Sequence, residues 1–82
     1  MSTSEKLYLS IISGLHDKNI KFKDLQKLLN ILGFDCRIRG DHFIYSFGDL
    51  RENINIQPSG NMAKPYQVKQ IRNFLQKYKI GF

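Results

Sequence analysis

The chain has 82 residues and a hydrophobic content of 41%, which excludes a second folded unit with its own core and predicts one globular domain. Its formal net charge of +6 indicates a polyanionic partner such as a nucleic acid, although small proteins without such a partner can also be basic. The single cysteine, Cys36, excludes an intramolecular disulfide, and no stretch approaches the ~18 apolar residues of a membrane span. We therefore expect a cytoplasmic protein in a reduced compartment.

The first third of the chain predicts two amphipathic helices. Ser2 or Ser4 can cap the first helix, and Gly14 is expected to end it. His16 then lies in a polar linker, where we expect a solvated residue without a chemical role. Apolar residues recur at helical spacing in the first helix (Leu7, Tyr8, Ile11, Ile12 and Leu15) and in the second (Phe22, Leu25, Leu28, Leu29 and Leu32), which Gly33 ends.

Two strands joined by a tight turn are expected next, over residues 34–39 and 42–47. In each run every second residue is apolar. This period of two is typical of half-buried strands. Gly40 and Asp41 fit a two-residue hairpin turn, because glycine readily adopts the positive φ needed at the first central position. This turn predicts three facing pairs: Arg39 with His42, Ile38 with Phe43, and Cys36 with Tyr45.

The two faces of the hairpin follow from this register. The side that carries the aromatic residues is expected to face the core, together with Cys36 and Ile38. Arg37, Arg39 and His42 share the opposite face, which is expected to be open to solvent. A slip by one residue would bury His42 and expose the aromatic residues, which disfavours any other register.

A third strand and a last helix complete the predicted fold. Ile54 and Ile56 alternate with polar residues over 53–57, and residues 58–61 close this strand. Lys64-Pro65 opens the helix, whose inner face is formed by Val68, Ile71, Leu75 and Tyr78. The order helix, helix, three strands, helix predicts the α+β class, with a three-stranded antiparallel sheet and the helices packed on one of its faces.

Positive charge is concentrated at the C-terminal end of the chain. Residues 53–82 include no acidic side chain, and their basic residues are Lys64, Lys69, Arg72, Lys77 and Lys79. We interpret Lys64, Lys69 and Arg72 as contacts to RNA phosphates, with a merely solvated helix face as the alternative. Tyr45 and Tyr66 are candidate stacking platforms for bases, but strand parity favours a core position for Tyr45.

Four segments in this order resemble the HicA toxins of prokaryotic toxin-antitoxin systems. They are the leucine-rich helix that ends in Leu32-Gly33-Phe34, the Gly40-x-His42 motif, the run Asn55-Ile56-Gln57-Pro58, and the run AKPYQVKQIR from Ala63 to Arg72. Gly-x-His alone has little specificity. The ordered set covers about residues 20–79 with spacings similar to those of the family.

The resemblance implies a fold similar to the double-stranded RNA-binding domain, with residues 1–82 as one HicA-like domain and residues 1–16 as an N-terminal helical extension. Members of the family are ribosome-independent mRNA endonucleases inhibited by a HicB partner. We therefore expect RNA and a HicB-type antitoxin as partners, no cofactor, and a monomer when the antitoxin is absent. The family depends on the histidine of a Gly-Ser-His motif, which corresponds to His42, and Asp41 replaces the serine. A carboxylate there can orient or charge-stabilise His42, or it can repel phosphate.

The chemistry of metal-independent RNA cleavage fits this cluster of residues. Histidine as a residue type titrates near neutrality, so His42 can take or give a proton, while Arg37 and Arg39 can hold phosphate with their planar donor groups. No second histidine lies nearby in sequence, so we expect a lysine, a tyrosine or water as the complementary acid and a slow nuclease. On the pattern alone, His42 can also be an ordinary polar residue beside a turn.

Two other functions compete with the nuclease hypothesis. One is a non-catalytic double-stranded RNA-binding module of similar topology, which needs shape and phosphate contacts but no histidine. The other is an interaction protein that only binds its antitoxin.

Overall fold

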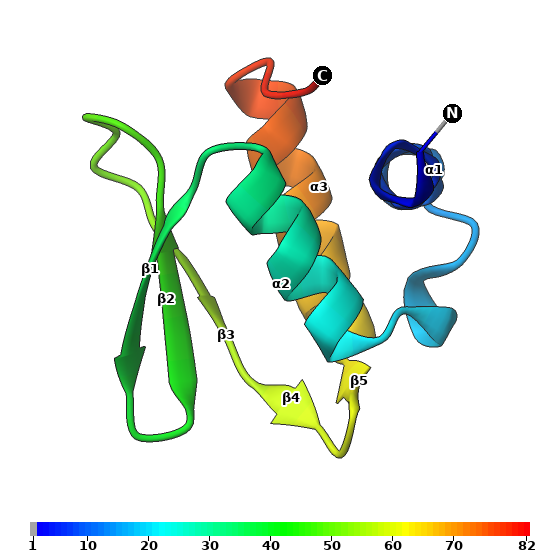
Figure 1. Ribbon diagram of the computed structural model, residues 1–82, viewed down its shortest axis with the longest axis horizontal. Coiled ribbons are helices and arrows are strands. Elements are labelled where there is room, and N and C mark those ends of the chain that lie inside the picture. Colours follow the sequence, from blue (N-terminus) through cyan, green and yellow to red (C-terminus); the bar gives the residue numbers. More distant parts are fainter. Residues whose placement is uncertain (1) are drawn as a thin grey trace.

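Three α-helices and a three-stranded antiparallel sheet form the fold of residues 2–82, which are the residues that the computed structural model describes (Figure 1). In chain order the elements are α1 (Thr3–Ser13), the 3-10 helix η1 (Asp17–Asn19), α2 (Phe22–Ile31), β1 (Asp35–Arg39), β2 (His42–Ser46), β3 (Ile54–Ile56), β4 (Pro58–Ser59), β5 (Met62–Ala63) and α3 (Pro65–Lys77). This order confirms the predicted α+β class. Met1, the first residue of the expected N-terminal extension, lies outside the described residues.

The β1–β2 hairpin has the predicted register. Arg39 faces His42 across the turn, and β3 continues the sheet antiparallel to β2, with Ile54 opposite Tyr45. Gly40, the first central residue of the turn, has a φ of 62°. Only glycine adopts this backbone conformation without a steric cost, so the turn and the register support each other.

The helices form two layers on one side of the sheet. Helices α2 and α3 lie against the sheet, and α1 packs across their far side and makes no extensive contact with the strands (Figure 1). The core between sheet and helices is apolar. Its fully buried side chains include Tyr45 and Ile56 from the sheet, Leu25, Leu28 and Leu29 from α2, and Val68, Ile71 and Leu75 from α3. Phe74 is also buried, whereas Tyr78, predicted on the inner face of the last helix, is only partly buried.

The caps of α1 explain where this helix begins and ends. Ser2 is the N-cap, and its hydroxyl accepts a hydrogen bond from the backbone N–H of Glu5. Gly14 ends the helix with a φ of 74°, as expected of a glycine in this position. Leu15 therefore lies beyond the helix and is exposed, which contradicts its predicted place on the apolar face.

Two long-range contacts fasten α1 to the C-terminal part of the chain. The Tyr8 hydroxyl donates a hydrogen bond to the carbonyl of Ile80 at 2.8 Å. On α3, Arg72 donates to the carbonyl of Ile11 at 3.1 Å and to both carboxylate oxygens of Asp17, at 2.9 Å for the shortest contact. Residues from both ends of the chain therefore hold each other in place.

Two sequence predictions fail at the edge of the sheet. Cys36 and Ile38 were expected in the core, yet all five residues of β1 are exposed, and Ile38 is 62% exposed. Both side chains do point to the helix side of the sheet, since they face Tyr45 and Phe43. They are exposed because β1 is the edge strand farther from α2 and α3, and the helices cover mainly β2 and β3 (Figure 1).

The short hairpin of β4 and β5 was also not predicted. The segment 58–61 was expected only to end the third strand, but it forms a second turn whose strands pair Pro58 with Ala63. This hairpin packs beside the start of α2, where the N–H of Phe22 donates to the carbonyl of Asn61 at 3.0 Å.

Candidate active site on the open face of the sheet

His42 lies on the face of the sheet that the helices leave uncovered. Its side chain is 47% exposed, as its place in the hairpin predicts. The imidazole is not free to rotate, however, because both ring nitrogens contact β3 or the residue that follows it. Nδ1 lies 3.1 Å from Oδ1 of Asn55, and Nε2 lies 3.3 Å from Nε2 of Gln57.

These contacts select one tautomer of the neutral imidazole. The Asn55 oxygen is an acceptor, so Nδ1 carries the proton and donates it, and Nε2 keeps its lone pair, which faces the amide donor of Gln57. A histidine in this state can accept a proton only at Nε2. The His42 ring is therefore positioned by two amide side chains of the neighbouring segment.

Asp41 stands next to the same nitrogen. Its carboxylate lies 3.7 Å from Nε2 of His42 and accepts a 2.9 Å hydrogen bond from the Gln57 amide. Through Gln57 the carboxylate can help to orient the ring, and because it is 77% exposed it would also meet an approaching phosphate, so both roles considered for Asp41 fit this geometry.

Gln67 of α3 holds the backbone of Gln57 in place from the helix side of the sheet. It is a buried polar residue of α3, only 5% exposed, and its side-chain oxygen accepts the backbone N–H of Gln57 at 3.1 Å. A buried amide that satisfies a backbone donor is costly to remove. Gln67 therefore fixes the end of β3 and, with it, the side chain that touches His42.

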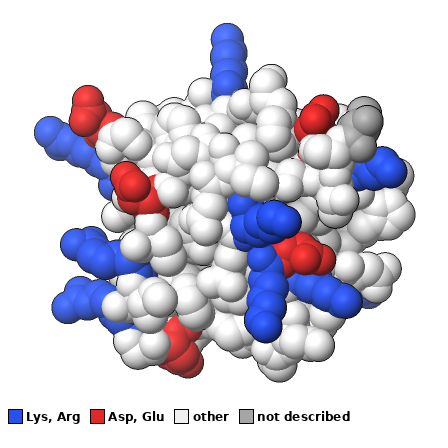
Figure 2. All heavy atoms as spheres, viewed as in Figure 1, with Lys and Arg blue, Asp and Glu red and all other residues white. Residues whose placement is uncertain are grey.

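Arg37 and Arg39 lie on the same face as His42, as predicted. Arg39 faces His42 directly and Arg37 faces Ile44, both on the exposed strand β1. Within residues 2–82 neither guanidinium forms an ion pair. Basic side chains project at the left edge of the molecule in Figure 2, where Figure 1 places β1. A shallow hollow of about 260 Å³, lined by Arg37, Ile44 and Asn53 among others, continues this face.

The basic residues of the last helix do not form one surface. Lys69 is exposed and Lys64 is partly exposed at the start of α3, which is compatible with contacts to phosphate. Arg72 is different, because its side chain is 15% exposed and its guanidinium is held by Asp17. Arg72 therefore does not lie on a solvated helix face, and its charge is already balanced within the protein.

The tyrosines separate into one core residue and one surface residue. Burial raises the pKa of Tyr45 to about 12, and a hydrogen bond with Cys36 acts in the same direction. Tyr45 is thus a neutral core phenol on the helix side of the sheet, away from the face that carries His42. Tyr66, 62% exposed in the first turn of α3, is accessible to a ligand.

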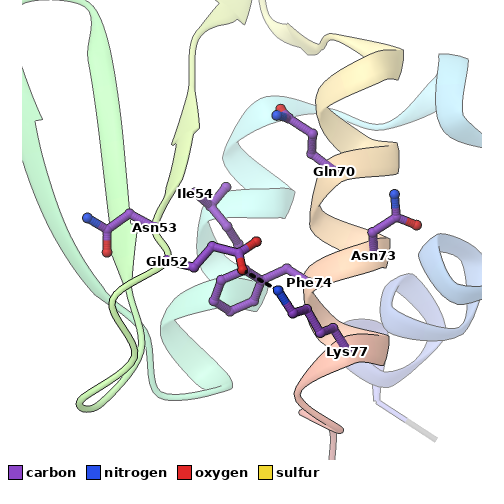
Figure 3. Close-up of a pocket in the computed structure, with 7 residues that line it drawn as sticks. All are labelled: Glu52, Asn53, Ile54, Gln70, Asn73, Phe74 and Lys77. Atoms are coloured by element: carbon purple, nitrogen blue, oxygen red, sulfur yellow. Dashed lines mark hydrogen bonds and ion pairs between the residues drawn. The ribbon is translucent and has the colours of Figure 1, made fainter.

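A second polar hollow, of about 210 Å³, lies between the start of β3 and α3 (Figure 3). Glu52 closes its end, where it accepts hydrogen bonds from Lys77 at 2.8 Å and from the Tyr78 hydroxyl at 2.7 Å. The hydrogen bond from Lys77 lowers the pKa of Glu52, and the same contact raises the pKa of Lys77. This pair fastens the β2–β3 loop to the end of α3.

The described part of the chain lacks two other kinds of feature. Within residues 2–82, no group of three or more His, Cys, Asp or Glu side chains is arranged to hold a metal ion. Nor do these residues include a helix long and apolar enough to cross a membrane.

Comparison with known proteins leaves the family open. The chain matches no protein-family model, and searches of curated proteins and of solved structures find no match either.

Asn55 and Gln57 are the site residues that the sequence did not single out for a role. The signal was present, since Asn53, Asn55 and Gln57 alternate with the core residues Ile54 and Ile56 and so had to share the face of His42. Only the register between β2 and β3 shows that Asn55 and Gln57 lie beside His42. A loop of seven residues separates Ser46 from Ile54, and a loop of this length does not specify the register of the strands that it joins.

Proposed function

We propose that this chain is a metal-independent endoribonuclease that cleaves mRNA in the manner of the HicA toxins, with His42 as the catalytic residue. The main support for the proposal is the exposure of the His42 ring and the way its two nitrogens are held. Its ring is solvent-accessible, is held by Asn55 at Nδ1, and presents Nε2 beside the carboxylate of Asp41. A structural histidine needs no such orientation of its ring.

Proton transfer at Nε2 fits the cleavage of RNA by its own 2′-hydroxyl. Nε2 of His42 removes the proton of this hydroxyl, the 2′-oxygen attacks the adjacent phosphorus, and the bond from phosphorus to the 5′-oxygen breaks. The products are a 2′,3′-cyclic phosphate and a 5′-hydroxyl, whose proton comes from a second acid or from water. Gln57 must move away from Nε2 for the substrate hydroxyl to reach it.

The charges around His42 serve the same reaction. The phosphate gains negative charge as the 2′-oxygen attacks, and Arg37 and Arg39 supply guanidinium donors on the same face. Asp41 stabilises the imidazolium that forms at the same moment. Lys64 and Lys69 extend the contacts to backbone phosphates.

The partners follow from the resemblance to the HicA family. We expect a cytoplasmic monomer that a HicB-type antitoxin inhibits by covering the open face of the sheet. That face carries Arg37 and Arg39, so the antitoxin surface opposite it should be acidic. No cofactor is part of the proposal.

The test compares the two histidines of the chain. His42→Ala should lower the rate of single-stranded RNA cleavage by about 10² to 10⁴, the usual loss for a general acid or base, with unchanged RNA affinity and an unchanged melting temperature. His16→Ala is the matched control, because His16 is exposed beside η1 on the α1 side of the fold and this variant should cleave like the parent. The cyclic phosphate is detected by mass spectrometry of the cut fragments.

The outcome decides between the enzyme and the binding module. If the His42→Ala protein cuts RNA as fast as the parent, the nuclease proposal is wrong for this residue. If neither protein cuts but both bind double-stranded RNA more tightly than single strands, the chain is a non-catalytic double-stranded RNA-binding module.

A further inference from the structure

A hollow of about 450 Å³ lies between the start of α2, β2 and the β4–β5 hairpin. It is on the helix side of the sheet and is separate from the His42 face. Its walls include Phe22, Phe43 and Pro58, and its rim includes Lys21, Lys23 and Asn61. The volume falls within the range of ordinary small-molecule sites.

The wall made by the hairpin is held in place by backbone hydrogen bonds. The N–H of Phe22 donates to the carbonyl of Asn61 at 3.0 Å, and the N–H of Ala63 donates to the carbonyl of Ile20 at 2.8 Å. Lys21 and Met62 also form a β-bridge. The hollow is therefore largely preformed, so a ligand would not have to order this segment before binding.

The lining combines three kinds of group that a nucleotide uses. Phe43 is half-buried and packs edge-to-face on Phe22 with ring centroids 5.2 Å apart, so an apolar aromatic wall remains open to a base. Lys21 and Lys23 are exposed, and within residues 2–82 neither forms an ion pair. Asn61 is an exposed amide at the mouth, where it can bond the edge of a base.

The hollow and the His42 site meet at the same end of the sheet. Phe43 follows His42 directly, and Pro58 follows Gln57, whose amide contacts the His42 ring at 3.3 Å. Adjacent residues of a strand point to opposite faces, so a nucleic-acid strand that passes around this end reaches both places. The Gly40-Asp41 turn forms the edge that it would cross.

We propose that this hollow binds one base of single-stranded RNA next to the phosphate that lies at His42, and that it determines which base is preferred beside the cleaved bond. The proposal rests on the proposed function, because it takes the substrate to be RNA. An acidic peptide with an aromatic residue would use some of the same groups. The continuity with His42 favours RNA.

The experiment uses the non-cleaving His42→Ala protein and four RNA hexanucleotides, each made of a single base. Affinities should differ among the four, and the preferred RNA should shift the NMR amide signals of Phe43 and Asn61. The same RNA with abasic nucleotides should bind more weakly and leave these two signals in place.

Two sets of substitutions in the His42→Ala background carry matched controls. Phe43→Leu keeps an apolar residue but removes the aromatic face, so it should weaken binding of the preferred RNA by about 5-fold or more and reduce the differences among the four RNAs. Phe82→Leu is its control, since Phe82 is an exposed aromatic that packs on Tyr8 of α1. Asn61→Ala, at an exposed turn, tests the same wall if the Phe43 variant does not fold.

The lysines are tested by the salt dependence of binding. Lys21→Gln combined with Lys23→Gln should lower the slope of log affinity against log salt by about 1.4, because each phosphate that a lysine neutralises on a single strand contributes ~0.7 to this slope. Lys6→Gln combined with Lys18→Gln changes the net charge equally on the α1 side and should leave the slope unchanged.

The results separate this inference from the nuclease proposal. If the parent cleaves RNA but the Phe43→Leu and Asn61→Ala variants keep full affinity and the same base preference, the hollow is not the base site and the nuclease proposal stands. If the parent neither binds nor cleaves RNA, both proposals are overturned. If a peptide of alternating Asp and Phe shifts the Phe43 and Asn61 signals and RNA does not, the hollow is a peptide site and the inference is wrong.

Discussion

Replacing Arg72 with alanine should destabilise the protein without acting directly on RNA. The substitution removes the donor that binds Asp17 at 2.9 Å and the carbonyl of Ile11 at 3.1 Å. It leaves the carboxylate of Asp17, whose side chain is only 20% exposed, without its cation. Breaking a fully buried ion pair costs ~3–5 kcal/mol, and the partial exposure of both groups reduces this to about 2 kcal/mol.

A change of this size is easily measured in a chain of 82 residues. One kcal/mol shifts the melting temperature of a small domain by ~4–8 °C, so Arg72→Ala should melt about 8–16 °C below the parent. Lys69→Ala removes the same charge from an exposed position of the same helix and should change stability by less than ~0.5 kcal/mol. Thermal unfolding followed by circular dichroism provides both numbers.

RNA binding distinguishes this explanation from the phosphate contact predicted from the sequence. At a temperature where both proteins are folded, Arg72→Ala should keep the salt slope of the parent, whereas Lys69→Ala should flatten it if Lys69 contacts a phosphate. An Arg72→Ala protein that melts like the parent and binds RNA with a flatter salt slope would refute the reasoning. So would a double-mutant cycle with Asp17→Ala that shows no coupling between the two residues.

Three further predictions concern the turn and the supports of His42. Gly40→Val should destabilise the hairpin by about 1–2 kcal/mol, because a β-branched residue is strained at a φ of 62°, whereas Gly40→Asn should cost less; equal melting temperatures for the two variants would exclude this turn. Gln67→Leu should leave the N–H of Gln57 unsatisfied, lower stability by about 1–3 kcal/mol and slow cleavage; full activity together with the melting temperature of the parent would contradict it. Asp41→Ser should slow cleavage if the carboxylate stabilises the protonated His42 at 3.7 Å, and a faster variant would show instead that Asp41 repels the substrate phosphate.

The hairpin register was predictable because three local signals agree. The turn glycine, the period of two on both strands and the aromatic side all specify that Arg39 faces His42, and the structure has this pairing. The exposure of Cys36 and Ile38 was not predictable by the same means. Alternation tells which side of a sheet a residue faces, but only the packing of α2 and α3 decides how far across the sheet the core extends.

Arg72 and the β4–β5 hairpin show two other limits of sequence analysis. Arg72 pairs with a carboxylate 55 residues away, and helical periodicity cannot reveal a contact between distant segments. Each strand of the short hairpin has two residues, which is too few to show any periodicity. Its turn residues signalled a change of direction, and the backbone bonds to Ile20 and Phe22 that stabilise it are again long-range.

The exposed position of Cys36 provides a natural attachment point for a probe. It is the only cysteine of the chain, so a thiol-reactive fluorophore would label one known place without any engineered residue. Its side chain points to the side of the sheet opposite His42, and Cys36 also borders the hollow beside Arg37, so the dye would lie at the edge of the open face. Quenching or anisotropy of such a conjugate can report in real time when a nucleic acid or a protein inhibitor arrives on the neighbouring surface, even with a non-cleaving variant.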